Sequence, residues 1–245
     1  MKAMILAAGL GTRLRPLTND KPKALVQIGG HTMLDMAIRY LVKFGIEEII
    51  INVHHLADQI EQYVRDNNYG ITIEFSDERQ ELLDTGGGIK HASWFLKGDA
   101  PFLVMAVDVL TDLNLNEMIR YHYQQNALVT LAVKDRSTTR KLLFDENMQL
   151  CGWKNNVTGE LKGVTSERGY TGLGFSVIHL LDPAIFDIMH ETGAFSIIDV
   201  YLRIMNTAKI IGFRHDEMDW MEFGRAENIP EIVNSPMFKK LITTL

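Results

Sequence analysis

The stretch "KAMILAAGLGTRL" (residues 2–14) decides the fold, because a run of apolar residues stops abruptly at a glycine-rich turn. Residues 3–8 are continuously apolar, which predicts a strand buried on both faces. Gly9 and Gly11 follow, and then Arg13 and, one residue beyond the stretch, Arg15. In open α/β sheets, ligands bind beyond the carboxyl ends of the strands, so this turn is the first place to look for a site.

The pattern of an apolar run followed by a helical segment repeats through the first half of the chain. Further buried strands are predicted at 47–53, 71–75, 101–107 and 127–133. Amphipathic spacing predicts helices at 32–45, 56–67, 86–96 and 115–125, the first of them capped by Thr32 and stopped at Gly45. The alternation indicates an α/β fold, with a Rossmann-like, mostly parallel sheet flanked by helices on both faces.

After about residue 140 the pattern changes. The segments "KLLFD", "LCGWK" and "YTGLGFSVI" predict short antiparallel strands, a helical stretch runs from Pro183 to Asn206, and a last helix is expected near 225–233. There is no repeat and no long linker. We therefore expect a single domain over residues 1–245, with a β-rich insertion in its second half.

Composition narrows the class of protein. The chain has 245 residues and a formal net charge of -6, which argues against a dedicated nucleic-acid binder. Its one cysteine, Cys151, can form no internal disulfide, which favours a reducing, cytoplasmic setting. The apolar amino terminus is too short for a signal peptide, and no window has 18 uninterrupted apolar residues, so no membrane span is expected.

The loop after the first predicted strand has the composition of an anion cradle. Glycine leaves backbone N–H groups free to converge on phosphate, and an arginine fork matches phosphate oxygens. Four cations lie close together, namely Arg13, Arg15, Lys21 and Lys23. The dinucleotide and Walker A fingerprints are both absent. A tight basic turn without a ligand is the alternative.

The segment "LAAGLGTRLRPLTNDKPKALVQIGG" (6–30) resembles the signature of the sugar-1-phosphate nucleotidyltransferases, also called sugar-nucleotide pyrophosphorylases. Weaker similarity extends through "LDTGGGI", "DVLTD", "YTGLGF" and "WMEFG". Among compact members, the chain is most similar to the N-acetylmuramate-1-phosphate uridylyltransferases and the mannose-1-phosphate guanylyltransferases. The resemblance implies the nucleotide-diphospho-sugar transferase fold, with a nucleotide-binding part over about 1–135 and a sugar-binding and second metal part over about 136–245.

The resemblance also implies site residues. Arg13 and Lys23 would be catalytic, with Lys23 reaching the α-phosphate or the incoming sugar phosphate. Nucleotide binding is implied for Ala8, Gly9, Gly11, Thr12, Arg13, Asp84 and Gly87, and sugar binding for Asp108 and Gly172.

Two carboxylates are expected to hold a divalent metal, taken to be Mg²⁺. Asp108 follows the predicted strand 101–107, where an ionised group needs a counter-charge. Family members usually have Gly-Asp there, whereas this chain has Val107. Glu222 stands where the family usually has aspartate and is one methylene longer, a difference that a hydrated Mg²⁺ could absorb. Asp112 is a weaker alternative.

For several residues the sequence allows two interpretations. The run Gly86–Gly88 would serve either close packing of a helix on the sheet or close approach of a nucleobase. Asp84 and Thr85 would cap that helix or touch the nucleotide. Gly172 would admit the sugar or mark a β-bulge. Asn52 and His54, at the end of the second strand, could face the site.

The reaction expected from the resemblance joins a nucleoside triphosphate to a sugar-1-phosphate and releases pyrophosphate. UTP with N-acetylmuramate-1-phosphate or a related hexose-1-phosphate is favoured. A GTP-dependent mannose- or heptose-1-phosphate guanylyltransferase, a CTP-dependent cytidylyltransferase and a non-catalytic sensing module are the alternatives. The expected partners are these two substrates and a second copy of the chain in a homodimer, and neither nucleic acid nor a membrane.

Overall fold

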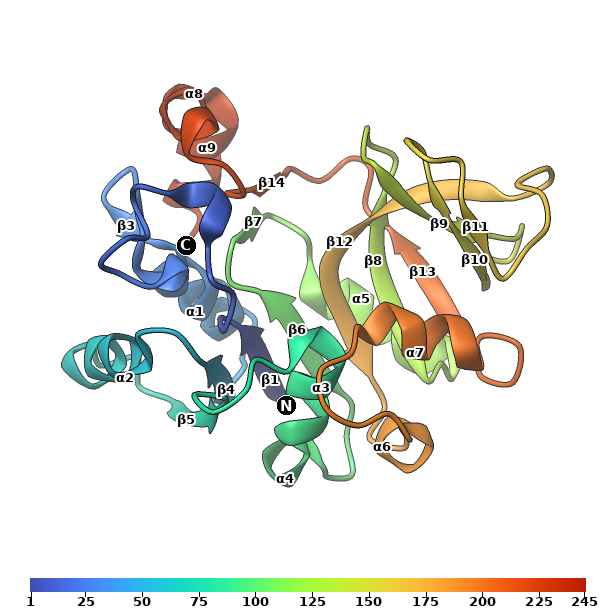
Figure 1. Ribbon diagram of the computed structural model, residues 1–245, viewed down its shortest axis with the longest axis horizontal. Coiled ribbons are helices and arrows are strands. Elements are labelled where there is room, and N and C mark those ends of the chain that lie inside the picture. The colour runs from blue at the N-terminus through green and yellow to red at the C-terminus, as the bar shows by residue number, and fades with distance from the viewer.

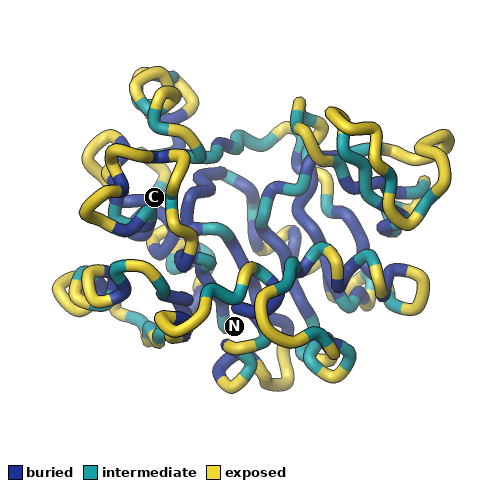
Figure 2. Tube along the Cα trace, in the orientation of Figure 1, coloured by how far each residue is buried: buried dark blue, intermediate teal, exposed yellow.

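The computed structural model describes residues 1–245 and contains a central sheet of ten strands with helices packed on both faces (Figure 1). Buried residues follow the strands of this sheet, whereas exposed residues lie mostly in the loops and outer helix faces (Figure 2). The α/β class and the mostly parallel sheet predicted from sequence are confirmed. No helix of the structure combines the length and the apolar character needed to cross a membrane.

Four parallel strands form the first half of the sheet. Their order is β5 (Thr72–Asp77), β4 (Glu48–Val53), β1 (Lys2–Leu6) and β6 (Phe102–Ala106). β1 pairs with β4 on one side and with β6 on the other, both in parallel. Because these strands run the same way, the loops that follow them gather at one edge of the sheet.

The second half of the sheet contains antiparallel strands. β12 (Thr171–Leu181) lies antiparallel to both β6 and β8 (Val129–Lys134), and β13 (Ile210–Arg214) is parallel to β8. β8 therefore runs in the same direction as β6, and its carboxyl end reaches the same edge. β12 is longer than the short strand predicted at this point, because its second half enters the main sheet.

The predicted β-rich insertion is present beside β12. It consists of β9 (Arg140–Phe144), β10 (Leu150–Asn155) and β11 (Leu161–Lys162), joined to the first residues of β12 in antiparallel pairs. The register of β12 against β8 shifts between Phe175 and His179. One sheet thus runs through both halves of the chain.

The side chains of the sheet alternate between two hydrophobic cores. In β1, Ala3 and Ile5 face the larger core, while Met4 faces the other. The larger core is covered by α1 (Met33–Lys43), α2 (Ala57–Asp66) and α5 (Leu115–Gln125). The opposite core is covered by α3 (Asp84–His91), α4 (Ser93–Leu96), α6 (Ile185–Ile188) and α7 (Ile197–Ile204).

Local signals set the ends of α1 as predicted. The Thr32 hydroxyl accepts a hydrogen bond from the Asp35 N–H at 3.1 Å, which caps the first turn. Gly45 follows the helix with φ 78°, the left-handed conformation that glycine adopts without strain. The expected helix over 86–96 is divided at Ala92 into α3 and α4, and the stretch from Pro183 to Asn206 contains two separate helices.

Three further features were not expected from the sequence. A short ribbon pairs β7 (Val109–Thr111) with β14 (Trp220–Glu222), and a small hairpin pairs β2 (Gln27–Ile28) with β3 (His31–Thr32). The chain ends in α8 (Ile229–Asn234) and α9 (Pro236–Thr243), of which only the first lies near a predicted helix. In α9 the Phe238 ring packs edge-to-face on Phe223 at 6.2 Å between centroids, next to the ribbon.

Candidate active site

The loop after β1 lines a cavity of about 330 Å³, here called the loop cavity. Its walls are residues 9–14 with Lys23, Leu82 and Gly224. Gly11 has φ 62°, and a Cβ there would come within 2.9 Å of Thr18 Cγ2 and 3.0 Å of Lys23 Cβ, so the turn needs glycine. A Cβ on Gly9 would meet nothing within 4 Å, so its backbone is open to a ligand. The structure therefore brings Gly9, Gly11, Thr12, Arg13 and Lys23 together, as the sequence predicts.

Buried hydrogen bonds fix the start of this loop. Asn52, at the end of β4, accepts hydrogen bonds at Oδ1 from the N–H groups of Ala7 at 2.7 Å and Ala8 at 3.3 Å. Its Nδ2 donates to Glu78 Oε1 at 2.9 Å, and Glu78 Oε2 accepts from the Leu83 N–H at 3.2 Å. Burial raises the pKa of Glu78 above its ordinary value. The expectation that Asn52 faces the site is wrong, because its amide is used inside the fold to hold the loop.

His54 also serves the fold. Its Nδ1 lies 2.6 Å from the carbonyl oxygen of Glu78, which ties the end of β4 to the segment after β5. It lines neither the loop cavity nor the larger cavity described below.

Lys23 and Asp108 form an ion pair at the floor of the site. Lys23 Nζ donates a hydrogen bond to Asp108 Oδ2. The two side chains are 16% and 9% exposed, so each charge depends on the other. Asp108 directly follows β6, at the carboxyl edge of the sheet where the sequence places it.

Arg13 and Glu222 form a second, looser pair. Arg13 Nη2 lies 3.9 Å from Glu222 Oε1, and the side chains are 63% and 35% exposed. The ribbon of β7 and β14 places Glu222 opposite Val109, and the Phe223 N–H donates to the Asp108 carbonyl at 2.9 Å. Asp108 and Glu222 therefore flank the same end of one ribbon, although 114 positions separate them in the numbering of the sequence.

A larger cavity of about 860 Å³, here called the basic cavity, lies on the far side of Glu222. Arg13 and Gly224 line both cavities, so the two meet at that point. Six basic side chains against three acidic ones line the basic cavity, in a chain whose net charge is -6. The basic residues are Arg13, Arg136, Arg140, Lys141, Lys162 and Arg225, and the acidic residues are Glu160, Asp199 and Glu222. The surplus of positive charge is suited to an anionic ligand.

The glycine run of α3 serves close packing. A Cβ on Gly86 would lie 2.5 Å from the Phe195 ring, and one on Gly87 would lie 2.5 Å from the Gly193 carbonyl oxygen. A Cβ on Gly88 would meet Glu78 Oε1 at 2.7 Å. The packing interpretation of this run is therefore confirmed. The nucleotide contact of Gly87 stays a prediction.

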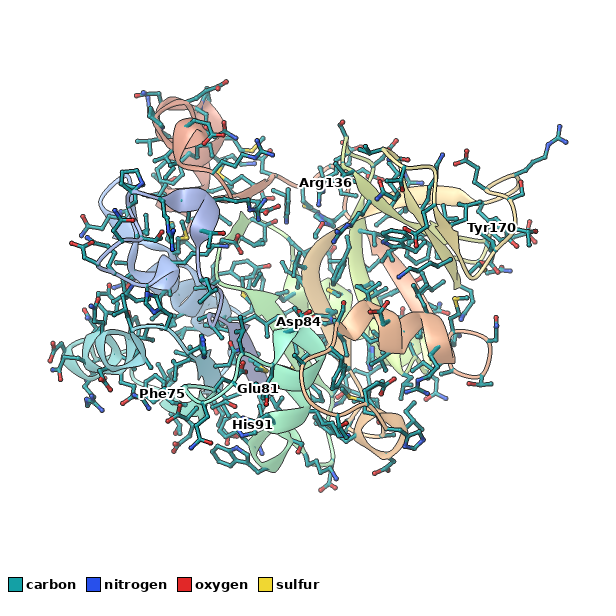
Figure 3. The ribbon with its side chains drawn as sticks, in the orientation of Figure 1. Phe75, Glu81, Asp84, His91, Arg136 and Tyr170 are labelled. Carbon is teal, nitrogen blue, oxygen red and sulfur yellow. The ribbon has the colours of Figure 1, made fainter.

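Neither Asp84 nor Thr85 is the N-cap residue of α3, which is Leu83, but Asp84 Oδ1 accepts a hydrogen bond from the Thr85 N–H of the first turn at 2.5 Å. Asp84 lies exposed at the start of the helix with φ 58° and lines neither of the two cavities (Figure 3). The Thr85 hydroxyl accepts a hydrogen bond from the Ile197 N–H at 3.0 Å, which fixes α3 to the start of α7. The capping interpretation is therefore wrong for Thr85, whereas Asp84 satisfies one N–H of the first turn, and the nucleotide contact of Asp84 stays a prediction.

Two further expectations need correction. Gly172 is regularly paired with Leu143, so it is no bulge; the irregular residue of β12 is Val177, with φ 56°. Asp112 is not at the site: its Oδ2 pairs with Lys240 Nζ at 2.8 Å and its Oδ1 accepts from the Asp219 N–H at 2.7 Å. Asp112 therefore connects α9 to the ribbon, and both of its carboxylate oxygens already have hydrogen-bond partners.

Apart from Arg13 and Glu222, the charged residues of the basic cavity were not predicted from the sequence. Arg136 and Arg140 follow β8, whose carboxyl end lies at the same edge as those of β1 and β6. The rule that ligands bind beyond such ends, applied to this strand, would have singled out the basic segment 134–141. Trp153 and Lys162 come from the antiparallel insertion, where no comparable rule applies.

The two carboxylates fit a magnesium ion. Mg²⁺ is usually held by one or two protein carboxylates together with substrate phosphates and waters. Asp108 and Glu222 supply two carboxylates at one end of the ribbon, and no group of three or more potential ligands is present. These residues would thus hold the ion jointly with a phosphate ligand, without forming a closed protein cage.

Comparison with known proteins identifies the family of this chain. The sequence model of the family described as "Nucleotidyl transferase" matches residues 2–142, which include the loop, Lys23 and Asp108. The chain belongs to the nucleotidyl transferase family.

Its relatives include named sugar-phosphate enzymes. The N-acetylmuramate alpha-1-phosphate uridylyltransferase of Neisseria meningitidis serogroup B is 32% identical over 94% of this chain and 96% of that protein. The enzyme of that name from Caulobacter vibrioides is 49% identical over 43% of this chain. A mannose-1-phosphate guanyltransferase of Gibberella zeae is 38% identical over 54% of this chain. The matches span only 45% and 37% of the latter two proteins.

Solved structures share the fold of this nucleotidyl transferase. HddC from Yersinia pseudotuberculosis, complexed with GMP-PN, superimposes with a TM-score of 0.76 over 98% of each chain at 24% identity. A putative glucose-1-phosphate thymidylyltransferase from Bacillus anthracis, in complex with a sucrose, has a TM-score of 0.78 over 98% of this chain and 99% of its own at 15% identity.

Proposed function

We propose that this chain transfers a nucleotidyl group from a nucleoside triphosphate to a sugar-1-phosphate, giving a nucleotide sugar and pyrophosphate. The observation that carries the proposal is the junction of the two cavities. Arg13 pairs with Glu222 at this junction, and Lys23, on the wall of the loop cavity, pairs with Asp108, so each predicted catalytic cation meets a predicted metal carboxylate. In this proposal the triphosphate occupies the loop cavity and the sugar-1-phosphate the basic cavity.

The chemistry requires charge neutralisation more than proton transfer. Both reactants are anions, and two unit charges 4 Å apart repel by about 4 kcal/mol at an effective dielectric constant of 20. The attacking phosphate is ionised at neutral pH, because its second pKa is about 6, so no general base is needed. Arg13 and Lys23 would bind the triphosphate and stabilise the charge that develops on the leaving pyrophosphate.

Asp108 and Glu222 are proposed to hold Mg²⁺. The ion would neutralise phosphate charge and orient the reacting groups when bound. With the carboxylates bound to the ion, Lys23 and Arg13 would be available to phosphate oxygens. The predicted nucleotide roles of Ala8, Asp84 and Gly87, and the sugar role of Gly172, belong to the same proposal, as does the division at about residue 135.

UTP and N-acetylmuramate-1-phosphate are the proposed substrates. The names of the Neisseria and Caulobacter relatives support them. A guanylyltransferase acting on mannose- or heptose-1-phosphate is the second candidate, supported by the Gibberella relative. We propose a cytoplasmic setting, as expected from the single cysteine.

The test is pyrophosphate release by the purified chain. It is incubated with Mg²⁺, each of the five nucleoside triphosphates and a panel of sugar-1-phosphates that includes N-acetylmuramate-1-phosphate. We expect release only when both substrates and Mg²⁺ are present, most rapidly with UTP, and none in EDTA. Nucleotide binding without pyrophosphate release under any pairing would contradict the proposal and favour a non-catalytic sensing module.

A further inference from the structure

Arg136 is a half-buried cation that has no carboxylate partner. Its Nη2 donates to the Phe175 carbonyl at 2.9 Å, and its guanidinium carbon lies 4.3 Å from the centroid of the Trp220 ring. Its Nε is buried without a hydrogen-bond partner. A Cβ on Gly174 would lie 2.9 Å from Arg136 Cγ and Nε, so the arginine is also held tightly against β12.

Most other cations of the basic cavity are already paired. Lys141 contacts Asp135 at 3.3 Å, Lys162 contacts Asp199 at 3.5 Å, and Arg13 contacts Glu222. Arg140 has no carboxylate partner either, but it is exposed to solvent. Burial lowers the pKa of Arg136 from its ordinary value, and the charge of Glu222, which lies beyond salt-bridge distance, offsets this only in part. A buried charge is normally paired, so this position is prepared for an anion that the chain does not supply.

The position of Arg136 indicates which part of a ligand it meets. Trp220 and Glu222 are two residues apart on β14, so their side chains share one face of the strand. Arg136 stacks on Trp220 and therefore lies beside Glu222, which in turn contacts Arg13 at the junction of the two cavities. Figure 3 shows Arg136 in this region, between β14 and the insertion strands. An anion on Arg136 thus lies on the basic-cavity side of the junction, close to the reacting phosphates.

We propose that Arg136 binds the phosphate of the sugar-1-phosphate acceptor. This inference rests on the proposed function. Arg136 contacts non-attacking oxygens of that phosphate, and the remaining oxygen forms a bond to the α-phosphorus of the triphosphate. The bond from the α-phosphorus to the bridging oxygen breaks, and pyrophosphate leaves with the electron pair. No proton is transferred. Arg13 and Lys23 hold the donor, and Arg136 holds the acceptor.

Guanidinium is suited to this task. It stays protonated, and its planar fork can contact two phosphate oxygens at once. The stacking on Trp220 and the bond to Phe175 fix the plane of the fork before the ligand arrives, so little side-chain entropy is lost on binding.

The test compares Arg136→Gln, Arg136→Lys and Gly174→Ala with the wild-type chain. Arg136→Gln should raise the KM of the acceptor about 10–100-fold, the usual range for a hydrogen bond to a charged group, and leave the KM of the triphosphate within about twofold. Arg136→Lys should rescue the acceptor KM only in part, because an ammonium cannot reproduce the fork. Gly174→Ala should raise it several-fold by displacing the arginine without removing its charge.

Arg120→Gln is the matched control, because Arg120 is exposed on α5 and lines neither cavity. It should behave as wild type. Equal effects of Arg136→Gln on the two KM values would overturn the proposal, as would no effect on either. Thermal unfolding of each variant separates loss of binding from loss of fold.

A second arm separates the acceptor phosphate from an acidic group on the sugar. N-acetylmuramate-1-phosphate carries a carboxylate that glucose-1-phosphate lacks, and the binding of each is measured by calorimetry or by competition. Arg136→Gln should weaken both ligands by the same factor. Weakening confined to N-acetylmuramate-1-phosphate would overturn the proposal and assign Arg136 to the carboxylate. If the wild-type chain releases no pyrophosphate with any acceptor, the proposed function fails, and these binding measurements still decide the role of Arg136.

Discussion

The two ion pairs of the candidate site differ in burial. Lys23 and Asp108 are largely shielded from solvent and directly hydrogen-bonded, whereas Arg13 and Glu222 are exposed and 3.9 Å apart. Exposed pairs typically contribute about 0–1 kcal/mol, while removing one partner of a buried pair costs several kcal/mol. The comparison indicates that folding fixes the Lys23–Asp108 pair, while the Arg13–Glu222 pair is free to rearrange when ligands bind.

The difference follows from where the four residues lie in the chain. Asp108 follows a central strand of the sheet, and Lys23 begins a short 3-10 helix over Lys23–Leu25 whose Ala24 is buried. Arg13 lies in the exposed loop after β1, and Glu222 in the short ribbon. Four predictions test the comparison.

Lys23→Ala should have the largest effect. Turnover should fall by about 10²–10³, the usual loss when a stabilising donor is removed from an active site. The free energy of unfolding should fall by ~3 kcal/mol, because Asp108 is left buried without a partner. Pyrophosphate release and chemical denaturation measure the two effects. Lys21→Ala, an exposed neighbour, is the control. Near-normal turnover of Lys23→Ala would remove Lys23 from the mechanism.

Asp108→Asn should change the metal requirement. An amide keeps one ligand oxygen but loses the negative charge, so the half-saturating Mg²⁺ concentration should rise at least about tenfold. The far-ultraviolet circular dichroism should stay that of the wild type. Asp112→Asn is the control, because Asp112 is bound to Lys240 away from the site. An unchanged Mg²⁺ titration for Asp108→Asn would exclude it as a ligand.

Gly87→Ala tests rigidity away from the two ion pairs, where α3 packs on the segment before α7. The new methyl group would press on the Gly193 carbonyl, so the free energy of unfolding should fall by about 1–3 kcal/mol, as for other overpacked positions. The proposed nucleotide contact of Gly87 should raise the KM of the triphosphate as well. Gly98→Ala, where a Cβ meets nothing within 4 Å, is the control. A large rise in KM with unchanged stability would instead assign Gly87 to nucleotide binding alone.

Glu222→Gln should have the smallest effect on stability. Loss of the exposed contact with Arg13 should change the free energy of unfolding by less than about 1 kcal/mol. If Glu222 is a metal ligand, the Mg²⁺ requirement should still increase, so the two readouts separate its roles. Denaturation at high salt should give a smaller difference from wild type than at low salt, because salt screens exposed charges. A loss of several kcal/mol would show that the Arg13–Glu222 pair is held as firmly as the Lys23–Asp108 pair.

Most of the fold could be predicted from sequence because its signals are local. The strands β1, β4 and β6 are short apolar runs, and the ends of α1 are set by Thr32 and Gly45. The ribbon of β7 and β14 could not be predicted, because each strand has only three residues and its partner is far away in the chain.

The site could be predicted where a motif is contiguous. The loop of residues 9–13 and Lys23 falls within one segment, and the structure brings these residues to one cavity. The role of the glycine run could not be decided, because packing and nucleobase approach both require a missing Cβ. Arg136 was overlooked because its significance depends on the direction of β8, which is set by pairing with β12.

A single strand joins the two halves of the site. Residues 171–173 of β12 belong to the insertion, and residues 178–181 belong to the main sheet, with Val177 between them. Rotation of the insertion relative to the main sheet would therefore have to bend or break a continuous strand. The distance between the two cavities is then set by the strand that the two halves share. In the proposed reaction, two substrates that must meet end to end would be selected by that distance as well as by their charge.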